Sequence, residues 1–137
     1  MNRLTLILFI SIFLSISYAC KKDDPAATTI IGRWELREVY DSGQMNGDPQ
    51  WQTISPEFRH VWEFQSEDNF IKIELRGNPL PDTCTGTYLL LSDSQLQYTS
   101  SCQVIINTVE ISLTSQTLIF TYIGREGNVY EKYVKIE

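Results

Sequence analysis

The chain has 137 residues and a formal net charge of −6, with 17 acidic and 11 basic side chains. This length suits one small domain. An acidic chain without a basic cluster excludes nucleic acid as the expected partner. The sequence holds a single long apolar run, at the N-terminus, so a polytopic membrane protein is excluded as well.

The N-terminus has the pattern of an export signal. Residues 4–16 are apolar, too short a run for a membrane span of ~20 residues but typical of the core of a signal peptide. Ser17 and Ala19 then place small residues where a signal peptidase reads them. We predict that residues 1–19 are a signal peptide; the mature chain, without Arg3, has a net charge of −7.

The next residue, Cys20, follows Ser17-Tyr18-Ala19, a run that resembles the lipobox of bacterial lipoproteins. The resemblance implies that the Cys20 thiol carries lipid and anchors the protein in the outer membrane. Residues 20–29 would be the polar tether, in which Lys22-Asp23-Asp24 resembles a tag for the outer face or is simply solvated. The alternative is cleavage at Ala19 that leaves Cys20 as a free thiol.

From Ile30 onward, short runs of β-branched and aromatic residues alternate with polar breaks, which indicates an all-β domain over residues 30–137. The even spacing favours an antiparallel meander, and so a barrel or a sandwich. The long connection Asp41–Pro56 is a candidate lid over a barrel mouth. We predict eight strands, at residues 32–40, 58–65, 69–76, 86–91, 95–102, 104–113, 117–123 and 129–136.

Hydrophobic patterning predicts the register of two hairpins. A turn at Ser66–Asn69 pairs apolar faces: Phe64 with Ile71, Trp62 with Ile73 and His60 with Leu75. Glu63 then lies opposite Lys72 on the outer face, with Glu74 beside them. A turn about Glu126 in the last hairpin pairs Tyr122 with Tyr130, Phe120 with Lys132 and Leu118 with Val134.

Two cysteines bracket a third hairpin. If its turn centres on Asp93, Tyr88 lies opposite Tyr98 and Cys84 opposite Cys102, all on one side. Opposed strand residues are close enough for a disulfide, and an exported protein folds where thiols oxidise. We therefore predict a Cys84–Cys102 bond, with two free thiols in the core as the alternative.

Gly32-Arg33-Trp34, at the start of the first of eight strands, resembles the lipocalin signature. The resemblance implies an eight-stranded up-and-down β-barrel in which Gly32 lets the chain enter the first strand and Trp34 plugs the closed end. Lipocalins stack a final-strand arginine on this tryptophan, and Lys132 is the nearest candidate here. The whole pattern resembles compact lipocalin-like lipoproteins of Gram-negative bacteria.

Residues for catalysis are scarce. His60 is the only histidine, and the chain has no Gly-x-Ser-x-Gly elbow, no glycine-rich phosphate loop and no zinc motif. We expect no enzyme, no metal and no cofactor. The candidate ligand-binding residues are His60, Trp62, Tyr88 and Tyr98, standing around a barrel mouth near the Asp41–Pro56 loop.

Two functions fit these features, and the resemblance to lipocalins favours the first. In the first, the protein binds a small, partly apolar ligand in or at the mouth of the barrel. In the second, the barrel is filled by its own side chains, and the protein is a non-enzymatic accessory or protein-interaction lipoprotein. Composition does not separate the two, because both bury the same aromatic face.

Overall fold

A computed structural model describes residues 28–43, 49–76 and 82–137. The predicted signal peptide, Cys20 and the tether as far as residue 27 lie outside these described residues. In the described part of the chain, no helix is long and apolar enough to cross a membrane.

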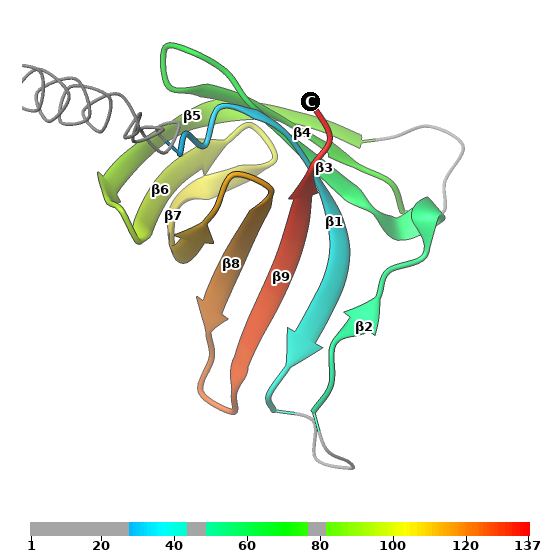
Figure 1. Cartoon of the computed structure of the whole chain (residues 1–137). Coiled ribbons are helices and arrows are strands. Elements are labelled where there is room, and N and C mark those ends of the chain that lie inside the picture. The colour runs from blue at the N-terminus through cyan, green and yellow to red at the C-terminus, as the bar shows by residue number, and fades with distance from the viewer. Residues whose placement is uncertain (1–27, 44–48, 77–81) are drawn as a thin grey trace, which may run out of the picture.

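The described residues form a closed antiparallel β-barrel (Figure 1). The strand bounds are β1 Gly32–Asp41, β2 Gln52–Thr53, β3 His60–Phe64, β4 Asn69–Glu74, β5 Asp82–Ser92, β6 Gln95–Ser100, β7 Gln103–Leu113, β8 Thr117–Ile123 and β9 Asn128–Lys135. Each strand from β3 to β9 pairs with the next, and β9 returns to pair with β1. The predicted all-β, eight-stranded up-and-down barrel is confirmed.

The short strand β2 is the element that the sequence did not predict. Along one edge, β1 pairs with β9 over most of its length. Along its other edge, β1 pairs with β3 near Gly32 and with β2 near Glu38. β2 and β3 therefore share one position in the barrel, joined by the 3₁₀ turn Pro56–Phe58. Residues 49–56 run along β1 and not across a barrel mouth, so the predicted lid is wrong for the described part of Asp41–Pro56.

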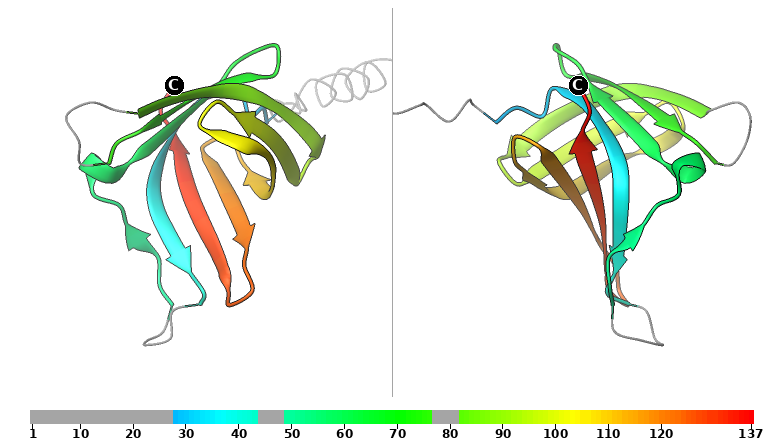
Figure 2. Two further views of the ribbon diagram at one scale, coloured as in Figure 1. Left: turned by 180° about the vertical axis from the view of Figure 1, so that it is seen from behind. Right: turned by 45° about the vertical axis from the view of Figure 1, so that its right-hand side comes forward.

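The barrel has two different ends. At the closed end the chain enters β1, and its last residues return to cover the same spot: the Arg33 amide donates to the Glu137 carbonyl at 3.0 Å. The open end carries the β1–β2, β4–β5, β6–β7 and β8–β9 connections. Figure 2 shows β1, β8 and β9 running down one side, while β4 and β5 cross over the top.

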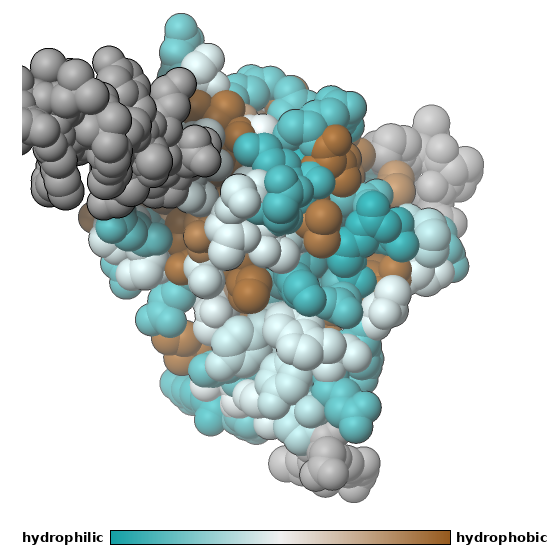
Figure 3. Space-filling view, in the orientation of Figure 1, coloured by the Kyte–Doolittle hydropathy of each residue, from teal (hydrophilic) through white to brown (hydrophobic). Residues whose placement is uncertain are grey.

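Aromatic side chains fill the half of the barrel towards the closed end. Trp62 lies at their centre, 4.8 Å from Phe70, 5.5 Å from Phe64 and 5.5 Å from Phe120 between ring centroids. All four side chains are almost fully buried. Such an interior is packed as densely as a crystal and leaves no room for a guest. Outside, apolar residues lie in small groups among polar ones on the face shown in Figure 3.

The β5–β6 hairpin has the predicted register. Tyr88 lies opposite Tyr98, and Leu90 lies opposite Leu96. Cys84 and Cys102 form the expected disulfide, with 5.6 Å between their Cα atoms. This hairpin was predictable because the cysteines and the tyrosine pair require the same alignment.

The predicted β3–β4 register is wrong by one residue. Phe64 lies opposite Phe70 and Trp62 opposite Lys72. The loop, residues 65–68, has four residues. Its Glu67 and Asp68 adopt left-handed conformations, and the Gln65 amide donates to the Asn69 carbonyl at 2.8 Å. This turn places Phe70 in the aromatic core, and burying a phenylalanine contributes about 1.5–3 kcal/mol.

This shift reverses the two faces of β4. Lys72 and Glu74 point into the barrel, whereas Ile71 and Ile73 lie half-buried on the outside. The predicted outer pair of Glu63 with Lys72 is therefore absent, and Glu63 lies 3.5 Å from Arg33 instead.

The predicted β8–β9 register is also wrong by one residue. Leu118 lies opposite Tyr133, and Phe120 lies opposite Glu131. The loop has four residues and ends at Gly127, whose φ of +154° suits glycine; a Cβ there would lie 2.5 Å from the Gly43 amide nitrogen. Glu131 and Tyr133 consequently point inward, and Lys132 points outward.

Candidate binding site at the open end of the barrel

Gly32 and Trp34 lie at the closed end as the resemblance implied, but the cation that stacks on the Trp34 ring is a different one from the residue predicted. Gly32 has a φ of +132°, and a Cβ there would lie 2.7 Å from the Lys135 side chain. Trp34 is fully buried, and its indole N–H donates to the Ile30 carbonyl at 2.7 Å.

The cation over Trp34 is Lys135, whose Nζ lies 5.1 Å from the ring centroid. The prediction of Lys132 is therefore wrong: it lies on the outer face, 5.5 Å from the Trp51 ring and 2.5 Å from the Glu38 carboxylate. The cause is the β1–β9 register, which pairs Trp34 with Lys135.

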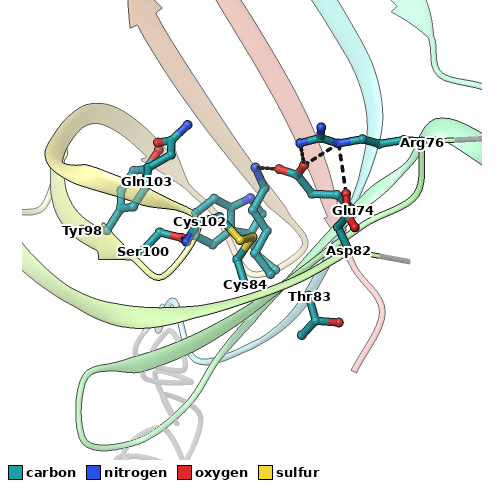
Figure 4. Close-up of a pocket in the computed structure, with 11 residues that line it drawn as sticks. Glu74, Arg76, Asp82, Thr83, Cys84, Tyr98, Ser100, Cys102 and Gln103 are labelled. Atoms are coloured by element: carbon teal, nitrogen blue, oxygen red, sulfur yellow. Dashed lines mark hydrogen bonds and ion pairs between the residues drawn. A yellow bond between two sulfur atoms is a disulfide. The ribbon is translucent and has the colours of Figure 1, made fainter. Parts of the chain in front are cut away.

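A cavity of about 290 Å³ opens in the other half of the barrel (Figure 4). Its apolar lining comes from Trp62, Tyr98 and the Cys84–Cys102 disulfide, and its polar wall includes Thr83, Ser100 and Gln103. It is bordered by the ends of the β4–β5 connection and by the β6–β7 turn, and none of the described residues of Asp41–Pro56 lines it. This cavity therefore lies away from the described part of that loop, of which Gln52 and Thr53 pair with β1.

One wall of the cavity is an ion cluster around Glu74, which is buried. Its carboxylate accepts hydrogen bonds from the Lys72 ammonium at 2.5 Å and from the Arg76 guanidinium; Asp82 lies 3.8 Å from Arg76. Burial alone would raise the pKa of Glu74, but the hydrogen bonds from Lys72 and Arg76 outweigh it and lower the pKa to about 2. Glu74 is thus ionised at neutral pH and holds both cations at the cavity.

Lys72 also joins this cluster to the aromatic floor. Its Nζ lies 5.1 Å from the centroid of the Trp62 ring, a distance typical of a cation–π contact. An ammonium group has three N–H donors, so Lys72 keeps donors for a ligand while it is paired with Glu74.

A second polar group, built on Glu131, lies inside the same half of the barrel. Its carboxylate accepts hydrogen bonds from the hydroxyls of Tyr122 at 3.1 Å and Tyr133 at 2.7 Å, and the Trp62 indole donates to the Tyr133 hydroxyl at 3.3 Å. Burial and the Glu131 charge raise the pKa of both tyrosines, so they remain protonated donors.

His60 lies on β3, opposite Glu74 of β4, and is half-buried. Its Nδ1 is buried and has no hydrogen-bond partner among the described residues. Burial and the nearby Lys72 charge lower its pKa, so the ring is neutral at neutral pH.

The structure brings together only some of the predicted binding residues. Trp62 and Tyr98 line the cavity, while His60 faces the same half of the barrel without lining it. Tyr88 lies in the packed half: its ring centroid is 5.0 Å from that of Phe64, and its hydroxyl donates to the Gln65 carbonyl at 3.1 Å. Tyr88 is therefore not a mouth residue, because β5 carries it past the cavity towards the closed end.

The charged residues of the cavity were missed. Lys72, Glu74 and Arg76 alternate along the chain, and the apolar residues Ile71, Ile73 and Leu75 between them suggested the opposite inner face. The usable signal was Phe70, which shares the parity of Lys72 and Glu74 and belongs with the aromatic core. Among the described residues, no group of three or more acidic, histidine or cysteine side chains is arranged to hold a metal.

Comparison with known proteins bears on the fold. No family model and no curated protein matches the sequence. Solved structures do match, among them a lipocalin-like protein from Bacteroides uniformis, with a TM-score of 0.56, and an uncharacterized protein from Bacteroides eggerthii, with a TM-score of 0.55. The fold is lipocalin-like.

Each match covers 77% of this chain at 16% identity, and 97% and 98% of the two matched chains respectively. At this identity the likeness concerns the fold, and the site must be argued from its own residues.

Proposed function

We propose that this lipocalin-like protein is a lipid-anchored, non-enzymatic binder of a small, partly apolar molecule, held in the open-end cavity. The observation that carries the proposal is the cavity of about 290 Å³ in the open half of the barrel, which lies between the Trp62 and Tyr98 rings and a wall of charged side chains. Ligand sites in proteins combine such an apolar surface with a few fixed polar groups.

The lining indicates the chemistry of the ligand. A flat or apolar part would lie against Trp62, Tyr98 and the disulfide. An acidic group would meet the Lys72 ammonium and the Arg76 guanidinium, of which Lys72 pairs with Glu74 and Arg76 pairs with both Glu74 and Asp82. We therefore propose a small ligand with an apolar body and an acidic group.

Binding is tested with the dye anilinonaphthalene sulfonate, an apolar body with one anionic group whose fluorescence rises on leaving water. We expect saturable binding that Lys72→Met weakens roughly tenfold or more, because a hydrogen bond to a charged group contributes about 1.5–3 kcal/mol.

The matched control is Lys132→Met. Lys132 also pairs with a glutamate at 2.5 Å and lies over a tryptophan ring, but on the outer face. It should leave dye affinity unchanged. If the folded protein binds no dye, or if both substitutions weaken dye affinity equally, binding in the cavity is contradicted. Either result would favour the accessory or protein-interaction role.

The anchor is proposed from the sequence alone, since Cys20 lies outside the described residues. Lipid on Cys20 would hold the domain in the outer membrane, because two or three acyl chains make a stable anchor. Cys20→Ser should abolish labelling by a clickable fatty acid and release the protein from the membrane fraction. A parent protein that takes up no label would overturn the lipoprotein assignment while leaving the cavity untouched.

A further inference from the structure

The closed end of the barrel has an apolar surface that the proposed ligand site does not use. Three consecutive leucines, Leu89, Leu90 and Leu91, precede Ser92 at the end of β5, and each is about half exposed. Ile31, at the entry to β1, is 44% exposed. Four large aliphatic side chains at one end of an acidic, exported domain indicate contact with something apolar.

A groove of about 290 Å³ lies at this end, beside the entering chain. Its apolar side comes from Ile30, Leu90, Ile111 and Leu113, and its polar side comes from Thr28, Thr29 and Asp93. Thr28 and Thr29 are the first described residues of the chain, so the chain enters the domain at this apolar end.

Chain length decides what can reach this surface. Cys20 precedes Thr28 by eight residues, and eight residues span at most ~29 Å when fully extended. If Cys20 carries lipid, as the proposed function holds, the leucines stay within a short distance of the bilayer. A short tether raises the effective concentration of the bilayer at this surface.

We infer that the closed end rests on the membrane, with Leu89, Leu90, Leu91 and Ile31 in contact with lipid; this inference rests on the proposed lipid anchor. The open end then faces the aqueous phase. The cavity, with Lys72, Glu74 and Arg76 in its wall, would then be reached from the aqueous phase. Exposed isoleucines also occur towards the open end, at Ile105, Ile106 and Ile123, but no tether begins there.

The test places a fluorescent reporter at each end of the lipidated, mature protein. Cys84 and Cys102 are bonded and Cys20 would be acylated, so one introduced cysteine is the only free thiol for nitrobenzoxadiazole labelling. Leu91→Cys reports on the closed end. Ile123→Cys, at an exposed aliphatic position at the end of β8, is the matched control.

The proteins are bound to phosphatidylethanolamine–phosphatidylglycerol vesicles with or without doxyl-labelled lipid. At position 91 we expect a blue-shifted emission that rises several-fold and is quenched by the doxyl lipid; at position 123 we expect a water-like spectrum without quenching. Equal, water-like spectra at both positions on vesicle-bound protein would overturn the contact of the closed end with lipid and would leave the proposed anchor standing. A change at position 91 that occurs without vesicles and grows with protein concentration overturns it in favour of a second copy of this chain.

Flotation of the same samples separates failure of the anchor. A lipidated protein that does not float with the vesicles overturns the anchoring, and the closed-end contact with it, whereas dye binding in the cavity is measured independently.

Discussion

The two halves of the barrel interior use the same inward-facing positions for different purposes. Towards the closed end these positions hold Trp34, Phe64, Phe70 and Leu118, which are buried against each other. Towards the open end the strands that carry Phe64 and Phe70 instead present His60, Lys72 and Glu74. A short barrel thus obtains its stability from one half and leaves the other half free to hold charges and a cavity.

The comparison also separates the energetics of the two halves. In the packed half each side chain contributes through the area that it removes from water. In the open half, buried charges are acceptable only because each one has a partner. Changes in the packed half should therefore alter stability without altering binding, and the following predictions test that division, the largest effect first.

Trp34→Ala should lower the free energy of unfolding by about 3–5 kcal/mol, because it removes a fully buried ring from the closed end. It also leaves the Ile30 carbonyl without its indole donor. Urea unfolding measures the loss, and dye affinity of the folded fraction should be unchanged. A variant as stable as the parent would show that the closed end does not depend on this ring.

Replacing both Cys84 and Cys102 by alanine should cost about 2–5 kcal/mol, the usual effect of losing a native disulfide in a small domain. The cavity wall is altered as well, so this change should weaken dye binding in the folded protein. Unfolding curves and dye titrations of the same samples check both effects. An alkylated Cys84 in a non-reducing peptide map of the parent would contradict the premise.

Glu74→Gln should lower stability at neutral pH by about 1–3 kcal/mol, because Lys72 and Arg76 lose their shared carboxylate. The pKa of Glu74 is about 2 in the folded protein and 4.5 ordinarily. A carboxyl group with a lowered folded-state pKa stabilises the fold above its unfolded pKa, and the contribution is lost as the pH falls from 4.5 to about 2.

The difference between the parent and Glu74→Gln should therefore shrink over that pH window, as unfolding curves at pH 7, 4.5 and 2.5 would show. Glu63→Gln is the control, since Glu63 is paired with Arg33 on the outer face, where such a pair contributes about 0–1 kcal/mol. Equal losses for the two variants would contradict the buried ion cluster.

Lys135→Met should have the smallest effect, about 0.5–1 kcal/mol, through its contact with the Trp34 ring. A double-mutant cycle with Trp34→Leu isolates this contact. The same cycle with Lys132→Met should give no coupling, since Lys132 lies over Trp51. If Trp34 is coupled to Lys132 and not to Lys135, the identification of Lys135 as the cation over the Trp34 ring is wrong.

Local patterns in the sequence were enough for several features. Alternation of apolar residues and even spacing determined the eight-stranded meander, and Gly32 and Trp34 marked its closed end. The Cys84–Cys102 hairpin was predictable because its cysteines, tyrosines and turn residues all require one alignment, so no other part of the molecule has to decide it.

The charged cavity depended on tertiary structure. In the β3–β4 and β8–β9 hairpins, turns of different length satisfy the local pattern, and a shift of one residue exchanges the two faces of a strand. The choice was made by distant packing: Phe70 joins Trp62 and Tyr98 in the core, and Gly127 packs against Gly43. These contacts turn Lys72, Glu74 and Glu131 inward, since a strand that buries one residue must also direct its alternate neighbours to the same side.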